Sequence, residues 1–288
     1  MPATVTAIAA QKGGTGKTAL TGSLAPQWAY AGHRTLAMDL DQQANLTYAF
    51  AVRPEVLDAT IVDVLAPRDP VPITDALMRD VHGVSGLDLV PCDERAEALD
   101  IQLRSEAMGV YRLREELEPL LDRYDRVFID CPPNVGELTM AALLAADEVI
   151  SPIKLSDTNA VRGLSRLHAT VEKLNRRGAS VAFKAIVALD YDERELAHQL
   201  NLDALRELAK RHGLPLAATR LRKRASWPKA ATQDVPLILL AENDLSTRDA
   251  QNDVRRLAQE LWPAVDFLYP SEITLARRAR GDGDRLAA

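Results

Sequence analysis

One segment near the N-terminus, TVTAIAAQKGGTGKTAL at residues 4–20, restricts the fold more than any other part of the chain. Residues 4–10 are small, apolar or β-branched without polar alternation, which is typical of a strand buried on both faces. A turn with Gly13, Gly14 and Gly16 follows, and residues 16–31 then carry apolar residues at helical spacing. This order predicts a phosphate-binding loop, because the turn and the helix N-terminus direct backbone N–H groups toward an anion.

Strand and helix patterns alternate along the rest of the chain. Apolar runs predict strands at 35–39, 87–91, 126–130, 148–153, 181–190 and 215–219. Helices are predicted at 94–122 with an interruption near Gly109, and at 137–146, 160–177, 195–212 and 247–262. We therefore expect an α/β, three-layer P-loop NTPase-like fold, with a mainly parallel twisted sheet and helices on both faces.

The domain organisation is expected to be simple. We predict a single domain over residues 1–280 and a disordered tail at 281–288, where the sequence is GDGDRLAA. Residues 42–86 and 220–246, which are rich in Pro, Asp and Arg, are expected to be irregular insertions or binding loops.

Composition limits the compartment and the partners. The net charge of −6 means that nucleic-acid binding would need a local basic patch. Cys92 and Cys131 form neither a disulfide framework nor a C-x-x-C motif, which favours a reducing cytoplasm. No signal-peptide pattern and no apolar run near ~18 residues is present, so we expect neither export nor a membrane span.

The glycine-rich turn fits the motif G-x-x-x-x-G-K-[ST] only in its last three positions, Gly16, Lys17 and Thr18. Gln11 stands where the first glycine is expected, and Lys12 adds a second lysine beside it. In this motif Lys17 reaches the β- and γ-phosphates and the Thr18 hydroxyl ligates Mg²⁺. The alternative, a turn with incidental lysines, does not explain the order of strand, glycines, Lys-Thr and helix. The predicted nucleotide-binding residues are Lys12, Gly13, Gly14, Thr15, Gly16, Lys17, Thr18 and Ala19.

Three aspartates follow predicted strands and could serve phosphate chemistry. Asp39 ends the strand at 35–39, Asp41 lies just beyond it, and Asp130 ends the strand at 126–130. Phosphoryl transfer to water needs Mg²⁺ held by carboxylates and a water aligned with the γ-phosphate. An isolated aspartate at a strand end is more often a cap or turn residue. Three of them alongside a phosphate-binding loop favour a catalytic site.

With Lys12 included, the turn has the pattern K-G-G-x-G-K-T, which resembles the deviant Walker A family of ATPases. This family includes ParA-type DNA-partitioning proteins, MinD-type division regulators and the nitrogenase iron protein. The resemblance implies ATP and Mg²⁺ as cofactors, and an ATP-dependent homodimer in which Lys12 contacts the phosphates of the partner subunit. Such a lysine would couple ATP binding to dimerisation.

Two acidic segments are similar to motifs of the same family. MDLDQQANLT at 38–47 is similar to D-x-D-P-Q-G-N-A-T, with Gln42 replacing the proline and Ala44 the glycine, and RVFIDCPPNVGELT at 126–139 is similar to the Walker B D-x-P-P segment. The resemblance implies that Asp39 supports the Mg²⁺ shell, Asp130 is a Mg²⁺-associated carboxylate and Asp41 orients the attacking water. The implied metal-site residues are Thr18, Asp39 and Asp130, and the implied catalytic residues are Lys12, Lys17 and Asp41.

Later segments are similar to ParA proteins in particular, though more loosely than the P-loop. They lie at 149–167, 188–195 and 219–237. The last holds the most basic stretch of the chain, and the resemblance implies that it contacts the phosphate backbone of DNA without base readout. A solvated charged loop is the alternative. The predicted DNA-binding residues are Arg220, Arg222, Lys223 and Arg224.

Other basic residues are left open. Arg277, Arg278 and Arg280 form a second cluster that could contribute or belong to a tail. Arg162 and Arg166, one helical turn apart, could be a partner surface or an ordinary polar face. ParA proteins commonly carry a proline near the adenine in the loop around residue 222, where Arg222 stands here, so the sequence assigns no adenine contact.

Taken as a whole, the resemblance implies a cytoplasmic, nucleoid-associated ParA-type partition ATPase. It would be a weak ATP hydrolase whose ATP dimer binds nonspecific double-stranded DNA, with turnover stimulated by DNA and a ParB-type centromere-binding partner. Because the P-loop begins about ten residues from the start, we expect no separate N-terminal DNA-binding domain.

The main alternative is a MinD-like or cargo-positioning ATPase that acts on membranes or protein assemblies. Residues 272–288 have few large apolar side chains for a membrane-inserting helix, so no membrane partner is expected. A nitrogenase-type reductase would need cluster-ligating cysteines, whereas Cys92 and Cys131 are expected to be packing residues. An ATP-dependent ligase or kinase stays open, because a P-loop does not name the phosphate acceptor.

Overall fold

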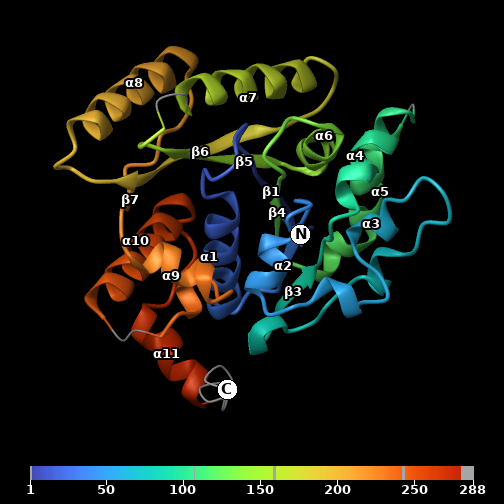
Figure 1. Ribbon diagram of the computed structural model, residues 1–288, viewed down its shortest axis with the longest axis horizontal. Coiled ribbons are helices and arrows are strands. Elements are labelled where there is room, and N and C mark those ends of the chain that lie inside the picture. Colours follow the sequence, from blue (N-terminus) through green and yellow to red (C-terminus); the bar gives the residue numbers. More distant parts are fainter. Residues whose placement is uncertain (1, 107, 158–159, 242–243, 280–288) are drawn as a thin grey trace.

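A seven-stranded sheet runs through the centre of the computed structural model, which describes residues 2–106, 108–157, 160–241 and 244–279 (Figure 1). The strand order is β3-β2-β4-β1-β5-β6-β7, and all neighbouring strands are parallel. The predicted α/β, P-loop NTPase-like fold with a mainly parallel sheet is therefore confirmed. The strands are β1 (Thr4–Ile8), β2 (Thr35–Asp39), β3 (Leu87–Val90), β4 (Arg126–Asp130), β5 (Glu148–Lys154), β6 (Ala182–Tyr191) and β7 (Leu221–Arg222).

Helices cover both faces of this sheet. The α-helices are α1 (Lys17–Tyr30), α2 (Asn45–Ala49), α3 (Ile61–Val64), α4 (Ala96–Arg104), α5 (Arg112–Leu117), α6 (Glu137–Ala145), α7 (Ala160–Asn175), α8 (Leu196–His212), α9 (Ser226–Thr232), α10 (Leu245–Leu261) and α11 (Pro270–Ala279). Short 3-10 helices lie at Pro54–Val56, Ile73–Asp75, Val81–Gly83, Gly109–Tyr111, Glu118–Arg123 and Leu237–Leu239. Helices α4 to α8 lie on one side, and α1, α9, α10 and α11 on the other (Figure 1).

The alternation of side chains along β4 divides the interior into two cores. Val127 and Ile129 pack with α5, α6 and α7, whereas Phe128 packs with α1 and α10. Because both faces of the central strands are buried, each strand needs apolar residues in succession. This requirement explains the unbroken apolar runs in the sequence.

The strand register brings three chain segments together at one edge of the sheet. Asp130 is the register partner of Ile8 on one side and of Asp39 on the other. The residues that follow β1, β2 and β4 therefore lie side by side at the carboxyl ends of parallel strands, where ligands bind in open α/β sheets.

At the opposite edge, Arg126 begins β4 inside the protein. Its Nη1 lies 2.6 Å from Oε1 of Glu148 and donates to the Thr6 hydroxyl at 3.1 Å. The guanidinium carbon also lies 4.4 Å and 5.0 Å from the ring centroids of Trp28 and Trp262. One side chain thus joins three strands to the aromatic cluster on the α1 side.

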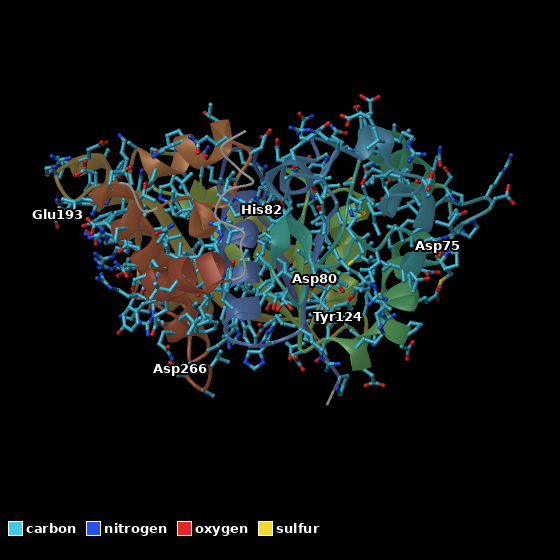
Figure 2. All side chains as sticks on the ribbon, turned by 90° about the horizontal axis from the view of Figure 1, so that it is seen from below. Asp75, Asp80, His82, Tyr124, Glu193 and Asp266 are labelled. Carbon is cyan, nitrogen blue, oxygen red and sulfur yellow. The ribbon has the colours of Figure 1, made fainter. Side chains whose placement is uncertain are left out.

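The segment between β3 and β4 is broken where the sequence predicts an interruption. The predicted helix at 94–122 is α4, a 3-10 turn and α5, because Gly109 approaches the preceding helix so closely that a Cβ would lie 2.8 Å from the Leu103 carbonyl oxygen. Just before β4, the hydroxyl of Tyr124 (Figure 2) donates to Asp88 of β3 at 2.6 Å. Burial and this carboxylate raise the pKa of Tyr124.

The predicted strand at 215–219 is wrong. This segment makes one isolated bridge, Leu216 to Ile186, and β7 instead begins at Leu221. Pro215 has no N–H to donate, and the N–H groups of Ala218 and Thr219 donate to the carboxylate of Glu260 at 2.6 Å and 2.8 Å. The N–H groups that would pair with a neighbouring strand therefore donate to a side chain of α10 instead.

The segments expected to be irregular contain short elements. Residues 42–86 hold α2 and α3, and residues 220–246 hold β7 and α9. Helix α11 was not predicted from the sequence. The tail predicted at 281–288 lies outside the described residues. Among the helices that the structure describes, none combines the length and apolar character needed to cross a bilayer.

Candidate functional site

The glycine-rich turn joins β1 to α1 in the predicted way. Gly14 and Gly16 have φ angles of 71° and 91°, in the left-handed region that side chains disfavour. Lys17 immediately follows as the first residue of α1. The turn can reverse the chain this tightly because glycines occupy these two positions, and it leaves the N-terminal N–H groups of α1 facing the ligand edge of the sheet.

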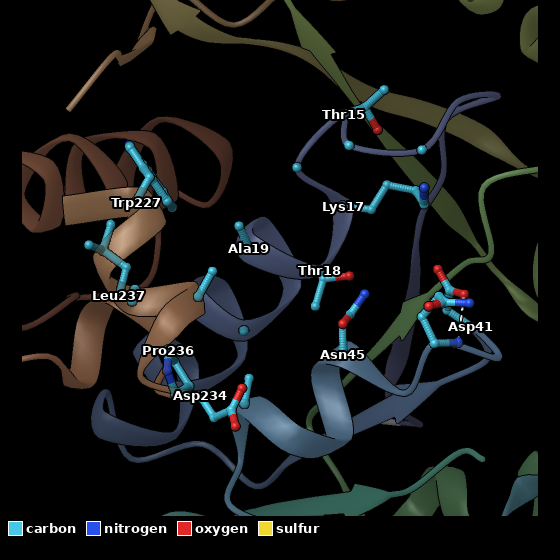
Figure 3. Close-up of a pocket in the computed structure, with 18 of the residues that line it drawn as sticks. Thr15, Lys17, Thr18, Ala19, Asp41, Asn45, Trp227, Asp234, Pro236 and Leu237 are labelled. Atoms are coloured by element: carbon cyan, nitrogen blue, oxygen red, sulfur yellow. Dashed lines mark hydrogen bonds between the residues drawn. The ribbon is translucent and has the colours of Figure 1, made fainter. Parts of the chain in front are cut away.

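A pocket of about 440 Å³ opens beside this turn (Figure 3). One end is polar and is formed by the turn, Asp41, Gln43 and Asn45. The other end is mostly apolar and is formed by α9 and the segment that follows it. The residues at the apolar end are Trp227, Ala230, Ala231, Asp234, Val235, Pro236 and Leu237. This shape and polarity suit a molecule with phosphates at one end and an apolar ring at the other.

The apolar end was missed by the sequence analysis. Its residues lie in the segment 219–237 that is similar to ParA proteins, and a tryptophan beside a proline and two alanines was a usable signal. Sequence periodicity could not show that α9 turns this side toward α1, about 200 residues earlier in the chain. At the apolar end, the lining proline is Pro236 rather than a residue near 222.

Lys17 and Thr18 lie at the polar end of the pocket. The Lys17 side chain is buried, and its Nζ donates to the carbonyl oxygen of Lys12 at 3.2 Å. The Thr18 hydroxyl donates to Oδ2 of Asp130 at 2.6 Å, and Thr21, one turn further along α1, donates to Oδ1 at 3.4 Å. The structure therefore brings the P-loop and the D-x-P-P segment into direct contact.

Asp130 is fully buried at the end of β4. Burial is the main reason that its pKa lies well above the ordinary aspartate value, and the charge of Asp39 raises it further. The bond from Thr18 and the charge of Lys17 act in the opposite direction. A buried carboxylate in this condition is stabilised in its charged form when a cation comes close.

Asp39 holds the loop that carries Asp41. Its Oδ1 accepts the N–H of Asp41 at 3.0 Å, and its Oδ2 accepts both the N–H and the hydroxyl of Thr47 at 2.9 Å. Burial raises the pKa of Asp39 to about 6, although these hydrogen bonds lower it. Both carboxylate oxygens thus accept hydrogen bonds from the loop that follows β2, and the part of Asp39 in a metal site stays a prediction.

Asp41 reaches the pocket from this loop (Figure 3). It is nearly buried, and its Oδ1 accepts the N–H of Gln43 at 3.1 Å. One of the two departures from the family motif shows in the backbone. Ala44 adopts the left-handed conformation, with a φ of 50°, at the position where the motif has glycine.

Lys12 points away from this pocket. Its Nζ lies 2.7 Å from Oδ2 of Asp157, in the loop between β5 and α7, and its side chain is 56% exposed. The lysine that distinguishes this P-loop is thus held by a carboxylate near the start of α7, while its backbone carbonyl accepts from Lys17. Its contact with a partner subunit stays a prediction.

The basic loop at 220–224 is more neutral than its sequence indicates. Arg222 makes two bonds to the buried carboxylate of Asp253, at 2.8 Å and 2.7 Å. The other cations also have partners on neighbouring elements. Lys223 pairs with Glu195 at 3.0 Å, Arg224 with Asp249 at 3.0 Å, and Arg220 lies over the ring of Tyr191 at 5.0 Å. Carboxylates on neighbouring elements therefore compensate most of the positive charge of this loop.

The second basic cluster is not a free patch either, as far as the structure describes it. Arg277 donates to the carbonyl oxygen of Leu239. Arg280 and the side chain of Arg278 lie outside the described part.

The donor set at the polar end fits Mg²⁺. A threonine hydroxyl and a carboxylate are oxygen ligands of the kind that this ion prefers, and Mg²⁺ usually completes its shell with water and substrate phosphates. Within the described residues, no group of three or more His, Cys, Asp or Glu side chains is arranged to hold a metal alone. Cys92 and Cys131 are both buried and free, as expected of packing residues.

Comparison with known proteins agrees with this geometry. An AAA domain family model matches residues 3–183. The chromosome partitioning protein ParA of Caulobacter vibrioides is 35% identical over 208 residues, which are 70% of this chain and 75% of that protein. The ATP complex of a Cyanothece McdA variant matches with a TM-score of 0.80 at 22% identity and covers 92% of this chain and 98% of its own.

A third match contains an adenine nucleotide together with magnesium. A structure described as cobyrinic acid a,c-diamide synthase of Mycobacterium smegmatis, with bound ADP and magnesium, has a TM-score of 0.70 at 29% identity. The match covers 81% of this chain and 92% of that one. ATP and Mg²⁺ are thus the cofactors of this fold and site. On the family model, the relatives and the assembled P-loop, the chain belongs to the ParA–MinD family of P-loop ATPases.

Proposed function

We propose that the protein is a partition ATPase that switches between two states according to the nucleotide it holds. The observation that carries this proposal is the convergence of Lys17, Thr18 and Asp41 on one pocket that has an apolar far end, with the buried Asp130 bonded to Thr18. ATP would lie with its phosphates on the P-loop and its adenine near Trp227 and the segment 234–237. Hydrolysis of this ATP follows from membership of an ATPase family.

In the proposed reaction, Lys17 leaves the Lys12 carbonyl and contacts the β- and γ-phosphates. Thr18 and Asp130 would hold Mg²⁺, which neutralises phosphate charge when bound. Asp41 orients the attacking water by accepting its hydrogen bond. Asp39 keeps Asp41 in place through the bonds to the loop described above.

Dimerisation is the proposed output of ATP binding. Lys12 would exchange Asp157 for the phosphates in a partner subunit, because a triphosphate offers more negative charge than one carboxylate. The nucleotide-sandwich dimer would bind double-stranded DNA without sequence preference. A ParB-type centromere-binding protein would stimulate hydrolysis, which is weak without it, and ADP would release the DNA. We place this cycle on the nucleoid, in the cytoplasm, without a membrane partner.

The loop at 220–224 would contribute to DNA binding by exchanging partners. Arg222 is held by a buried carboxylate and stays in place, whereas the exposed pair of Lys223 with Glu195 can open at little cost. Arg220 and Lys223 are therefore the residues of this loop that we expect to contact phosphate.

The test uses Asp41→Ala, which removes the residue that orients water and leaves the phosphate contacts. We expect this variant to bind ATP, to lose turnover and to remain a dimer in light scattering. It should bind random-sequence duplex DNA with ATP but not with ADP, and binding should weaken steeply as salt rises. Undiminished hydrolysis would remove Asp41 from the reaction. An ATP dimer that binds no duplex would contradict DNA partition and favour a membrane or protein cargo.

A further inference from the structure

The outer face of α7 carries positive charge that the nucleotide site does not use. Arg162, Arg166 and Lys173 lie in α7, and Arg177 follows two residues after its end. All four are exposed. Successive spacings of four, seven and four residues place them on one side of the helix. We call these four residues the α7 basic stripe.

The stripe is not neutralised within the described part of the protein. None of its four side chains lies within ion-pair distance of a described carboxylate, in contrast to Arg222, Lys223 and Arg224. Glu172, the acidic residue of α7, forms an ion pair with Arg176, with 3.6 Å between Oε2 and Nη1. The stripe is therefore a local excess of positive charge on a chain whose net charge is −6.

The two ends of the stripe differ in what they do for the helix. Lys173 lies in the last turn and Arg177 just after it, where the helix dipole favours a cation. Arg162 lies in the first turn, where the dipole disfavours one, and it also repels Arg166 four residues later. Because helix stability does not account for the cations at the N-terminal end, an external anion is the better explanation for them.

The chemistry of the stripe favours a phosphate backbone over a protein partner. Protein interfaces usually have an apolar or aromatic centre, and no exposed large apolar side chain lies on the described part of α7. From Arg162 to Arg177 the stripe spans about 22 Å at the helical rise of 1.5 Å per residue. One strand of a duplex presents a phosphate about every 3.4 Å of axis, so several phosphates lie within this reach.

The end of α8 packs on the other side of α7. The ring of His212, at the end of α8, lies 4.9 Å from the ring of His168 in the middle of α7. At about 100° per residue, His168 faces roughly 150° away from the stripe, so this contact with α8 does not cover the stripe. We propose that the α7 basic stripe binds the phosphate backbone of double-stranded DNA without base readout. The inference rests on the proposed function and assigns its DNA contact chiefly to α7 rather than to the loop at 220–224.

The test compares two charge-reversed pairs in the Asp41→Ala background with ATP. Arg166→Glu with Lys173→Glu alters the stripe. Arg114→Glu with Arg123→Glu makes the same change of net charge at exposed positions in and after α5. We expect the stripe pair to weaken binding of a random 30-base-pair duplex at least tenfold, and to lower the slope of log affinity against log salt by about 2. The control pair should change affinity less than threefold.

Further measurements separate this contact from misfolding and from a failed function. ATP-dependent dimerisation, thermal unfolding and, with Asp41 intact, basal ATP turnover should be unchanged by the stripe pair. Arg166→Gln with Lys173→Gln should give a smaller loss of the same kind. Equal losses in the stripe and control pairs, or none in either, would overturn the inference. So would a stripe pair that binds duplex normally but loses stimulation by a protein partner. If the Asp41→Ala protein without further substitutions binds no duplex in the presence of ATP, the proposed function itself would be overturned.

Discussion

At the residue scale, neighbouring charges decide what each site residue can do. Asp130 and Asp39 sit side by side and buried, Lys17 is near them, and Lys12 is held outside the pocket by Asp157. The same residue type therefore plays different parts. One lysine is buried at the phosphate site, and the other is exposed and free to exchange its partner.

Lys12 should be needed for dimerisation and not for folding. Its pair with Asp157 is half exposed, so losing it should change the free energy of unfolding by less than about 1 kcal/mol. We expect Lys12→Ala to bind ATP as a monomer, measured by light scattering across an ATP titration. Asp157→Asn is the matched variant, and it should dimerise at lower ATP concentration because Lys12 is released. An ATP dimer of ordinary stability in Lys12→Ala would contradict the assignment.

Asp39 should make the nucleotide-free protein more stable as pH falls. Its folded pKa of about 6 lies above the ordinary value of 3.8, so the folded state binds more protons between these values. The stability that protonated Asp39 contributes is complete below pH 3.8 and is lost as pH rises through about 6.

Denaturant unfolding of wild type and Asp39→Asn at several pH values measures this effect. Between pH 7.5 and pH 5 wild type should gain about 1 kcal/mol relative to the variant, since one pKa unit corresponds to about 1.4 kcal/mol. A difference between the two proteins that does not depend on pH would show that Asp39 titrates normally.

At the element scale, α4 and the start of α6 are coupled through one carboxylate. Oδ1 of Asp100 on α4 accepts the N–H of Leu138 at 2.9 Å. A Cβ on Gly136, just before α6, would lie 2.5 Å and 2.6 Å from the two oxygens of this carboxylate. The loop that leads from Asp130 to α6 is thus packed directly on α4. A change in the conformation of this loop would therefore move α4.

Gly136→Ala should displace the Asp100 side chain and break its bond to α6. Since the carboxylate can rotate, we expect a loss of about 1 kcal/mol, similar to the loss of a helix cap, rather than a failure to fold. Urea unfolding of Gly136→Ala, Asp100→Ala and the double variant forms a cycle that isolates the contact. Strictly additive losses would show that the two residues do not interact.

At the scale of the whole molecule, the buried Arg126 joins parts that are distant in sequence. It connects β4 to Glu148 of β5 and to Thr6 of β1, and its guanidinium lies on the aromatic rings of Trp28 and Trp262. Burial lowers its pKa, although the charge of Glu148 opposes this effect. The two ends of the parallel strands thus differ. The pocket lies at their carboxyl ends, whereas an internal ion pair closes the sheet at their amino ends.

Arg126→Ala should cost roughly 3 to 5 kcal/mol, because it leaves the mostly buried carboxylate of Glu148 without its main partner. Lys184 lies 3.8 Å from this carboxylate and compensates only in part. Unfolding in guanidinium chloride measures the loss of stability. The control variant is Arg34→Ala, which breaks an exposed pair with Asp125 and should cost less than about 1 kcal/mol. Equal losses in the two variants would contradict a special role for burial.

The sequence by itself determined the α/β class, the central strands, the P-loop and its acidic partners. These features depend on local signals: apolar runs that only a doubly covered strand needs, glycines that a tight turn needs, and aspartates at strand ends. The order in the chain was enough to place Lys17, Thr18 and Asp130 together, because parallel strands end at one edge.

Only the tertiary structure decided the features that depend on contacts between distant segments. Glu260 accepts the N–H groups of Ala218 and Thr219, which the expected strand at 215–219 would have used. Carboxylates between β6 and α8 and on α10 pair with Arg222, Lys223 and Arg224 of the loop at 220–224. The same packing turned Trp227 and Pro236 toward α1. Within the part of the chain that the structure describes, it also left the α7 basic stripe without ion-pair partners. A sequence records which charges and rings a segment carries, but which of them are paired or buried follows from the neighbours that folding supplies.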